Sequence, residues 1–115
     1  MLRLPKRRVL KKPSLFQEVY RKGRSEVNRY LVLYVFPAIG LETRAGFAAG
    51  RKLGNAVTRN RLKRLMRESF RHELPRVREG MFLLLVARRG ALGVKEPVMA
   101  KAFRALGRKM GIFED

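Results

Sequence analysis

Apolar side chains recur with helical spacing through the middle of the chain. Gly54-Asn55 is typical of a turn followed by a helix N-cap, and no glycine or proline follows before Pro75. Apolar or small residues then come three or four positions apart, which is the spacing of a buried helix face, at Leu62, Leu65, Met66, Ser69 and Phe70. We therefore predict a helix over residues 56–73 with this face in the core.

The opposite face of the same helix is polar and basic. It carries, about 160° away on the helical wheel, Asn60, Arg64, Arg67 and Arg71. Arg59 and Arg61 fall near the first turn, where the helix dipole disfavours each cation by about 0.3–1 kcal/mol. A bound anion would reverse that penalty. Because the stretch from Arg51 to Arg71 has eight basic residues and one acid, we interpret this face as a polyanion site rather than a solvated surface.

Shorter patterns predict elements before this helix. Residues 1–13 hold three arginines, three lysines and two prolines and are typical of an extended basic lead-in. Ser14 is a plausible N-cap, with Gln17 at the capping-box position, for a helix that ends before Gly23. Residues 30–36 are β-branched, aromatic or leucine and predict a strand, with one face formed by Tyr30, Val32, Tyr34 and Phe36.

Three further elements complete the expected fold. A second strand is expected over residues 44–52, where small side chains allow close backbone approach. Residues 81–86 are apolar at every position, which predicts a central strand buried on both faces. A last helix over residues 97–110 would bury Val98, Ala102, Ala105 and Leu106, with Met99, Phe103 and Met110 nearby. The order is helix, two strands, helix, strand, helix, which indicates a single small α/β sandwich over residues 1–115.

Composition limits the classes of function. The 115 residues include 28 basic and 9 acidic ones, for a net charge of +19, and 46% are hydrophobic. Such a chain is a folded basic domain that binds a nucleic acid or an acidic membrane surface. It has no cysteine and no apolar run near the roughly 20 residues of a membrane span. We expect a cytoplasmic protein that is not in a membrane.

The sequence offers no catalytic or metal-binding set of its own. His72 is the only histidine and lies near a helix end, where a surface or cap role is expected. No spacing of histidine and carboxylate residues matches a metal site. No pair of carboxylates, P-loop or nucleophile elbow stands out. We therefore predict no catalytic residues and no metal ligands in the protein.

The basic helix and its flanks resemble the bacterial ribonuclease P protein subunit. The signature stretch runs from Gly54 to Glu68 and contains the Arg-Asn-Arg box at residues 59–61. The resemblance also covers, upstream and downstream of the box, Leu10-Lys11-Lys12, Phe16, Val19-Tyr20, Lys22-Gly23-Arg24-Ser25, Tyr34, Gly46-Phe47, Arg51-Lys52 and Ala87-Arg88. It therefore extends over nearly the whole chain.

This resemblance implies a fold and an activity. The family's fold is a mainly antiparallel sheet packed with helices, with a left-handed βαβ crossover, as in the second domain of ribosomal protein S5. Its RNA subunit is the catalyst of an endoribonuclease that uses Mg²⁺, held mainly by RNA, to remove the 5′ leader of precursor tRNA. The partners implied are ribonuclease P RNA and that leader, with one protein per RNA.

The same resemblance assigns two groups of residues. Those expected to contact the catalytic RNA, with Arg71 added from the basic face, are Arg59, Asn60, Arg61, Lys63, Arg64, Arg67 and Arg71. Those expected to line a cleft for the leader are Phe16, Tyr20 and Tyr34, with Arg51 and Lys52 near phosphates. Each of these aromatic rings could stack on an unpaired base for about 1–3 kcal/mol.

Two departures and two alternatives accompany this interpretation. The chain has Gly50 where a serine is common in the family, and Gly80-Met81-Phe82 where an acid often precedes the strand.

A ribosomal or general RNA-binding protein would also explain the charge and size, but would not require the box beside the aromatic set. A basic helix on a membrane surface is disfavoured because its apolar face is needed for the core.

Overall fold

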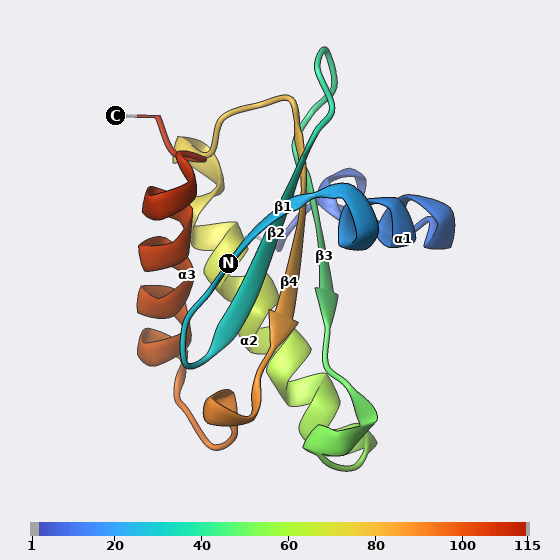
Figure 1. Cartoon of the computed structure of the whole chain (residues 1–115). Helices are drawn as coiled ribbons and strands as arrows, with labels where there is room; N and C mark the ends of the chain where they lie inside the picture. Colours follow the sequence, from blue (N-terminus) through green and yellow to red (C-terminus); the bar gives the residue numbers. More distant parts are fainter. Residues whose placement is uncertain (1–2, 115) are drawn as a thin grey trace.

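A four-stranded mixed sheet carries helices on both of its faces (Figure 1). The computed structural model describes residues 3–114. Its strands, in the spatial order β1-β2-β4-β3, are β1 (Arg24–Val27), β2 (Leu31–Pro37), β4 (Met81–Ala87) and β3 (Arg44–Ala48). Its main helices are α1 (Pro13–Lys22), α2 (Ala56–Glu73) and α3 (Glu96–Met110). Of the three strand pairs in this sheet, β3 and β4 pair in parallel and the other two pairs are antiparallel, so the expected mainly antiparallel sheet packed with helices is confirmed.

Helix α2 connects the two parallel strands. In Figure 1, β3 and β4 both point down, β4 lies to the left of β3, and α2 runs behind the sheet. This arrangement is a left-handed crossover, the opposite of the usual hand of βαβ connections. It matches the hand that the family resemblance implies.

Strand β4 is central and buried on both faces, as predicted. Leu83, Leu85 and Ala87 belong to the larger apolar cluster, under α2 and α3. Phe82 and Leu84 belong to a smaller cluster, under α1. The hydrophobic core is therefore divided by the sheet into two layers.

Helix α2 has the boundaries and the buried face that the sequence predicts. The Asn55 side chain accepts a hydrogen bond of 2.9 Å from the backbone N–H of Thr58 and caps the helix. Leu62, Met66 and Phe70 are almost completely buried.

Several predicted boundaries were wrong. Helix α1 begins at Pro13, and Lys12 rather than Ser14 is its N-cap, without a side-chain cap; proline is suited to the first helical position because its φ is already helical. Strand β3 ends at Ala48, and residues 51–53 form a short 3-10 turn instead of continuing the strand. The short edge strand β1 was missed because its mostly exposed sequence has no apolar pattern.

Two predictions about buried faces were also wrong. Strand β2 begins at Leu31, so Tyr30 lies in the preceding turn and packs on the larger cluster instead of joining Tyr34. On α3 the predicted burial of Ala102 and Leu106 is confirmed, and the neighbouring Met99, Phe103 and Met110 are buried as well. The predicted core residues Val98 and Ala105 are exposed. Alanine and valine spacing alone did not distinguish the two sides of this helix.

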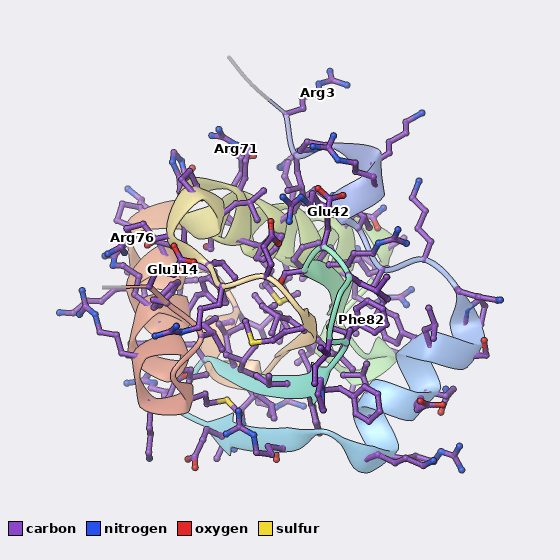
Figure 2. All side chains as sticks on the ribbon, turned by 90° about the horizontal axis from the view of Figure 1, so that it is seen from above. Arg3, Glu42, Arg71, Arg76, Phe82 and Glu114 are labelled. Carbon is purple, nitrogen blue, oxygen red and sulfur yellow. The ribbon has the colours of Figure 1, made fainter. Side chains whose placement is uncertain are left out.

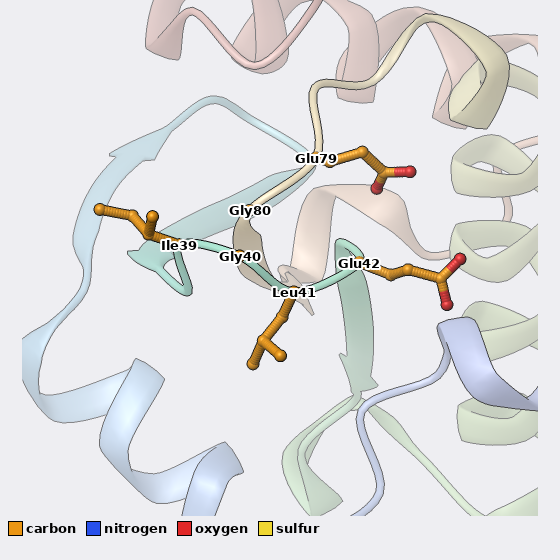
Figure 3. A pocket seen from close by; sticks show the side chains of 6 residues that line it. All are labelled: Ile39, Gly40, Leu41, Glu42, Glu79 and Gly80. Atoms are coloured by element: carbon orange, nitrogen blue, oxygen red, sulfur yellow. The ribbon is translucent and has the colours of Figure 1, made fainter.

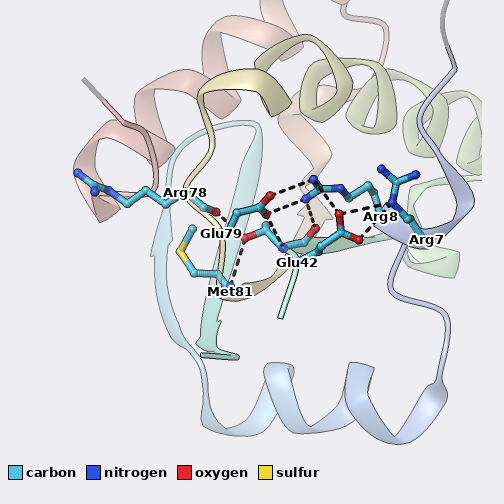
Figure 4. A network of polar contacts seen from close by, with 7 residues as sticks. Arg7, Arg8, Glu42, Arg78, Glu79 and Met81 are labelled. Atoms are coloured by element: carbon cyan, nitrogen blue, oxygen red, sulfur yellow. Dashed lines mark hydrogen bonds and ion pairs between the residues drawn. The ribbon is translucent and has the colours of Figure 1, made fainter. Parts of the chain in front are cut away.

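The amino-terminal lead-in is anchored to the fold rather than simply extended; its first two residues lie outside the described part of the chain. Leu4 and Leu10 are buried, and residues 6–8 form a 3-10 turn. Arg8 makes two hydrogen bonds with the Glu79 carboxylate, Nη1 to Oε1 at 2.8 Å and Nη2 to Oε2 at 3.0 Å (Figure 4). Thr43 N–H also donates to Glu79 at 2.9 Å. This network ties the lead-in to both β3 and β4.

The two departures from the family pattern fit the local backbone. Gly50 has φ −70°, and a Cβ there would meet nothing within 4 Å, so a serine would also fit. Gly80 has φ +86°, a conformation that favours glycine. Strand β4 then starts regularly, with Met81 paired to Pro37.

Gly23 and Gly50 form a matched test of packing. A Cβ on Gly23 would lie 2.6 Å from the Val19 carbonyl oxygen and 3.0 Å from that of Val35. Because both contacts are with backbone, Gly23→Ala should lower the free energy of unfolding by about 1–3 kcal/mol. Gly50→Ala should leave it unchanged or raise it by up to about 1 kcal/mol. Urea unfolding measures both; equal effects would contradict the packing at Gly23.

The lead-in network predicts a dependence of stability on pH. The hydrogen bonds from Arg8, and then from Thr43 N–H, lower the pKa of Glu79 below its ordinary value of 4.5. A lowered carboxylate pKa stabilises the fold above the ordinary value, and this stabilisation is lost as pH falls through the lowered pKa. Glu79→Gln should therefore cost about 1 kcal/mol or less at pH 7, because the side chain is 55% exposed.

The measurement is the free energy of unfolding of both proteins between pH 7 and pH 3. The variant should lose less stability than the parent over the acidic part of this range. Identical slopes for the two proteins would show that the ion pair contributes nothing to the acid sensitivity.

Candidate nucleic-acid interface

The outward face of α2 is a row of exposed polar side chains. Asn60, Arg64 and Arg67 are all exposed, as the helical wheel predicts. The Arg67 guanidinium carbon lies 5.3 Å from the centroid of the Phe47 ring, which holds this arginine over the edge of the core. These three side chains present donors to a ligand on the solvent side of α2.

The other predicted RNA contacts near the start of α2 do not share that face. Arg61 Nη2 donates to the Val94 carbonyl oxygen at 2.7 Å, which fastens α2 to the segment before α3. Arg59 and Lys63 are half-buried, and the Arg59 Nε is buried without a hydrogen-bond partner among the described residues. The residues predicted as one RNA site therefore spread around the first half of α2.

The pairing of acidic residues leaves this helix positively charged. Six acids of residues 3–114 form ion pairs, all of them with cations outside the Arg-Asn-Arg box. One of these pairs lies on α2 itself: the Arg71 guanidinium bonds Glu68 at 2.9 Å and lowers the pKa of that carboxyl. Within residues 3–114, no ion pair involves Arg59, Arg61, Lys63, Arg64 or Arg67. Their charge is left for an external anion.

An aromatic cleft lies on the other face of the sheet, beside α1. It has a volume of about 290 Å³. Its walls are Phe16, Gln17, Tyr20, Ala48, Ala49, Gly50, Leu84 and Val86. Gly46 lets Phe16 lie against β3, because a Cβ there would be 2.5 Å from the Phe16 ring. Small residues on β3 thus keep the cleft open, as the sequence suggested.

Two of the three predicted aromatic residues line the cleft, and the third adjoins it. The Tyr20 and Tyr34 rings are 5.3 Å apart and tilted by 51°. Tyr20 is 55% exposed, so its ring is available to a ligand. Burial, and then the neighbouring Tyr20, raise the pKa of Tyr34 above its ordinary value of 10.

The remaining predicted cations stand between the two surfaces. Arg51 and Lys52 are exposed in the 3-10 turn that directly follows Gly50 of the cleft and precedes α2. The chain from β3 to α2 therefore passes around the sheet edge and joins one surface to the other.

Sequence reasoning missed part of the cleft wall. Gln17 was interpreted only as a capping residue, whereas it lines the cleft, and Leu84 is a core residue, as predicted, that also forms part of the cleft wall. The one signal in the sequence for Gln17 as a cleft residue was its position directly after Phe16 on an exposed helix. The side-chain alternation of β4 placed Leu84 on the α1 face, but periodicity cannot show that a helix leaves part of that face uncovered.

A hollow outside these surfaces lies at the β2–β3 loop (Figure 3). Its two acids, Glu42 and Glu79, point to the same side, away from Ile39. Both are bonded to arginines of the lead-in. The hollow therefore offers no free carboxylate.

One group of potential metal ligands was not foreseen. The ligand atoms of Glu68, His72 and Glu96 lie within 4.8 Å of one another. Sequence spacing could not reveal this, because Glu96 comes from a different helix. Arg71 already donates three hydrogen bonds to Glu68, which disfavours a metal ion beside it.

In residues 3–114 no helix is long and apolar enough to cross a membrane.

Comparisons with known proteins agree on one family. A family model described as Ribonuclease P matches residues 4–111. The ribonuclease P protein component of Symbiobacterium thermophilum is 44% identical over 106 residues, which cover 91% of this chain and 92% of the relative.

Solved structures give the same result. The Staphylococcus aureus RNase P protein superposes with a TM-score of 0.84 at 29% identity, covering 95% of this chain and 100% of that one. The RNase P protein of Thermotoga maritima gives 0.74 at 26% identity, covering 94% and 97%. With the Arg-Asn-Arg box on basic helix α2 and an aromatic cleft on the opposite face of the sheet, the chain belongs to the bacterial ribonuclease P protein component family.

Proposed function

We propose that this chain binds ribonuclease P RNA through α2 and the 5′ leader of precursor tRNA in the aromatic cleft. The observation that carries the proposal is the separation of two different surfaces by one sheet. Unpaired arginines suit the backbone of a folded RNA, whereas a cleft with aromatic walls suits an unpaired strand. The complex removes the leader endonucleolytically and leaves the mature tRNA 5′ end.

The protein's contribution is binding and positioning. The RNA subunit carries the chemistry, and Mg²⁺ ions are held mainly by RNA phosphates. The described donor set fits this assignment, because Glu68 is engaged by Arg71 and six acids are already in ion pairs. By neutralising phosphates, α2 would lower the Mg²⁺ concentration that the complex needs.

The alternative is a ribosomal or general RNA-binding protein without a nuclease role. Membership of the family disfavours it, and a general binder has no need for the cleft beside α1. A cytoplasmic location and one protein per RNA remain predictions.

The direct test is leader cleavage by a bacterial ribonuclease P RNA at low Mg²⁺. Adding the chain should stimulate cleavage of precursor tRNA and give a mature 5′ end. RNA binding without stimulation would contradict the proposal and favour the alternative.

Arg64 tests the α2 surface. Arg64→Ala should weaken binding to ribonuclease P RNA and reduce the slope of log affinity against log salt by roughly one unit, because one phosphate contact is lost. Arg108→Ala is the matched control, since Arg108 is also an exposed helical arginine but lies on α3. An unchanged slope for Arg64→Ala, or equal effects of both variants, would remove Arg64 from the interface.

Tyr34 tests the cleft. Tyr34→Ala should reduce the preference for precursor over mature tRNA by about tenfold, because a stacking partner and its support for Tyr20 are lost. Binding of the catalytic RNA alone should not change. Competition binding measures both affinities, and equal losses for precursor and mature tRNA would indicate a purely structural role.

A further inference from the structure

A second apolar groove lies away from both of these surfaces. It runs between the turn joining β1 to β2 and one side of α3, and has a volume of about 330 Å³, within the range of small-ligand sites. Its apolar walls are Tyr30, Val98, Ala102 and Ala105. β1 is the sheet edge opposite to β3, so the groove is on the far side from the turn that precedes α2.

The groove is preformed because Asn28 fixes the turn against α3. Its Oδ1 accepts hydrogen bonds from the backbone N–H groups of Tyr30, at 2.9 Å, and Leu31, at 3.0 Å. Its Nδ2 donates to the Ala102 carbonyl oxygen at 3.1 Å. Gly90 packs closely on the same turn, since a Cβ there would be 2.4 Å from the Arg29 carbonyl oxygen. A rigid wall reduces the entropy lost when a ligand binds.

Two of the apolar α3 side chains in this groove, Val98 and Ala105, lie outside the core. Val98 is 38% exposed and Ala105 is exposed, whereas Met99 and Phe103 are fully buried. Single exposed apolar residues are common on protein surfaces. Here they gather in one hollow beside a half-buried tyrosine, which gives a flat apolar ligand a place to lie.

The charges at the groove favour an anionic ligand. Arg29 and Lys101 line it, and no acidic residue does. The Arg29 guanidinium carbon lies 5.8 Å from the centroid of the Tyr30 ring. Glu26 on β1 is paired with Lys109 at 3.1 Å. A tyrosine ring and an arginine plane both stack on nucleobases, and both cations can hold a phosphate.

We propose that this groove binds an unpaired nucleotide of an RNA. The base would lie against Tyr30, Val98 and Ala105, and its phosphate would contact Arg29 and Lys101. The inference rests on the proposed function only in taking RNA as the partner. The nucleotide could come from the catalytic RNA or from the precursor tRNA.

Methyl NMR of the full chain tests the site directly. A single-stranded RNA of five nucleotides should shift the Val98 and Ala105 methyl resonances, whereas inorganic polyphosphate of matched charge, which can contact Arg29 and Lys101 but has no base, should shift them less. Ala105→Trp fills the groove from an exposed position and should abolish the Val98 shift, while the Val86 methyls in the cleft still respond. No shift at Val98, or an equal shift with polyphosphate, would overturn the proposal.

Affinities for the catalytic RNA and for precursor tRNA, measured in the assembled complex, identify which RNA supplies the nucleotide. Ala105→Trp and Lys101→Gln should each weaken binding of the RNA that supplies the nucleotide, by about tenfold for the former, and leave the other RNA unaffected. Leu41→Trp, which adds the same bulk to an exposed loop, is the control. If neither affinity changes while Arg64→Ala still weakens RNA binding, the nucleotide site in the groove is refuted and the proposed function stands.

Discussion

The arrangement of this protein depends on covering β4 on both faces. Every residue of that strand is apolar, and its alternating side chains enter two separate clusters. One face needs α2 and α3, and the other needs α1. Because α1 is short and covers only part of its face, the apolar surface left beside it becomes the cleft. The need to bury one strand thus places two surfaces of different chemistry on opposite sides of the molecule.

Electrostatics then separates structural from available cations. The acids are few, and six of them hold cations in place, as at Arg8, Arg71 and Arg76. The lead-in, the end of α2 and the start of α3 are stabilised in this way. In the view from above, Arg71 lies on α2, and Arg76 lies beside Glu114 (Figure 2). The cations of α2 from Arg59 to Arg67 form no ion pair among the described residues, so their charge is available to neutralise the phosphates of an RNA.

The sequence predicted an element correctly where a local pattern of capping or apolar residues is enough to define it. Asn55 and the spacing from Leu62 to Phe70 define α2, and the uniform apolarity of residues 81–86 identifies the central strand. It failed where tertiary contacts decide. Helix α1 begins at Pro13 rather than Ser14, and Tyr30 lies outside its predicted strand because Asn28 closes the turn before it. On α3, Val98 is exposed although its spacing predicted burial. The cleft aromatics came from family resemblance, and Gln17 was found only from the structure.

The central claim is that the two faces of one sheet contact two different RNA strands. The chain has no cysteine, so Val57→Cys at the start of α2 and Gln17→Cys in the cleft can each carry a single hydroxyl-radical probe. In a complex with ribonuclease P RNA and precursor tRNA, the probe at residue 57 should cleave the catalytic RNA and the probe at residue 17 should cleave the 5′ leader. Cleavage of the same strand from both positions would contradict the account.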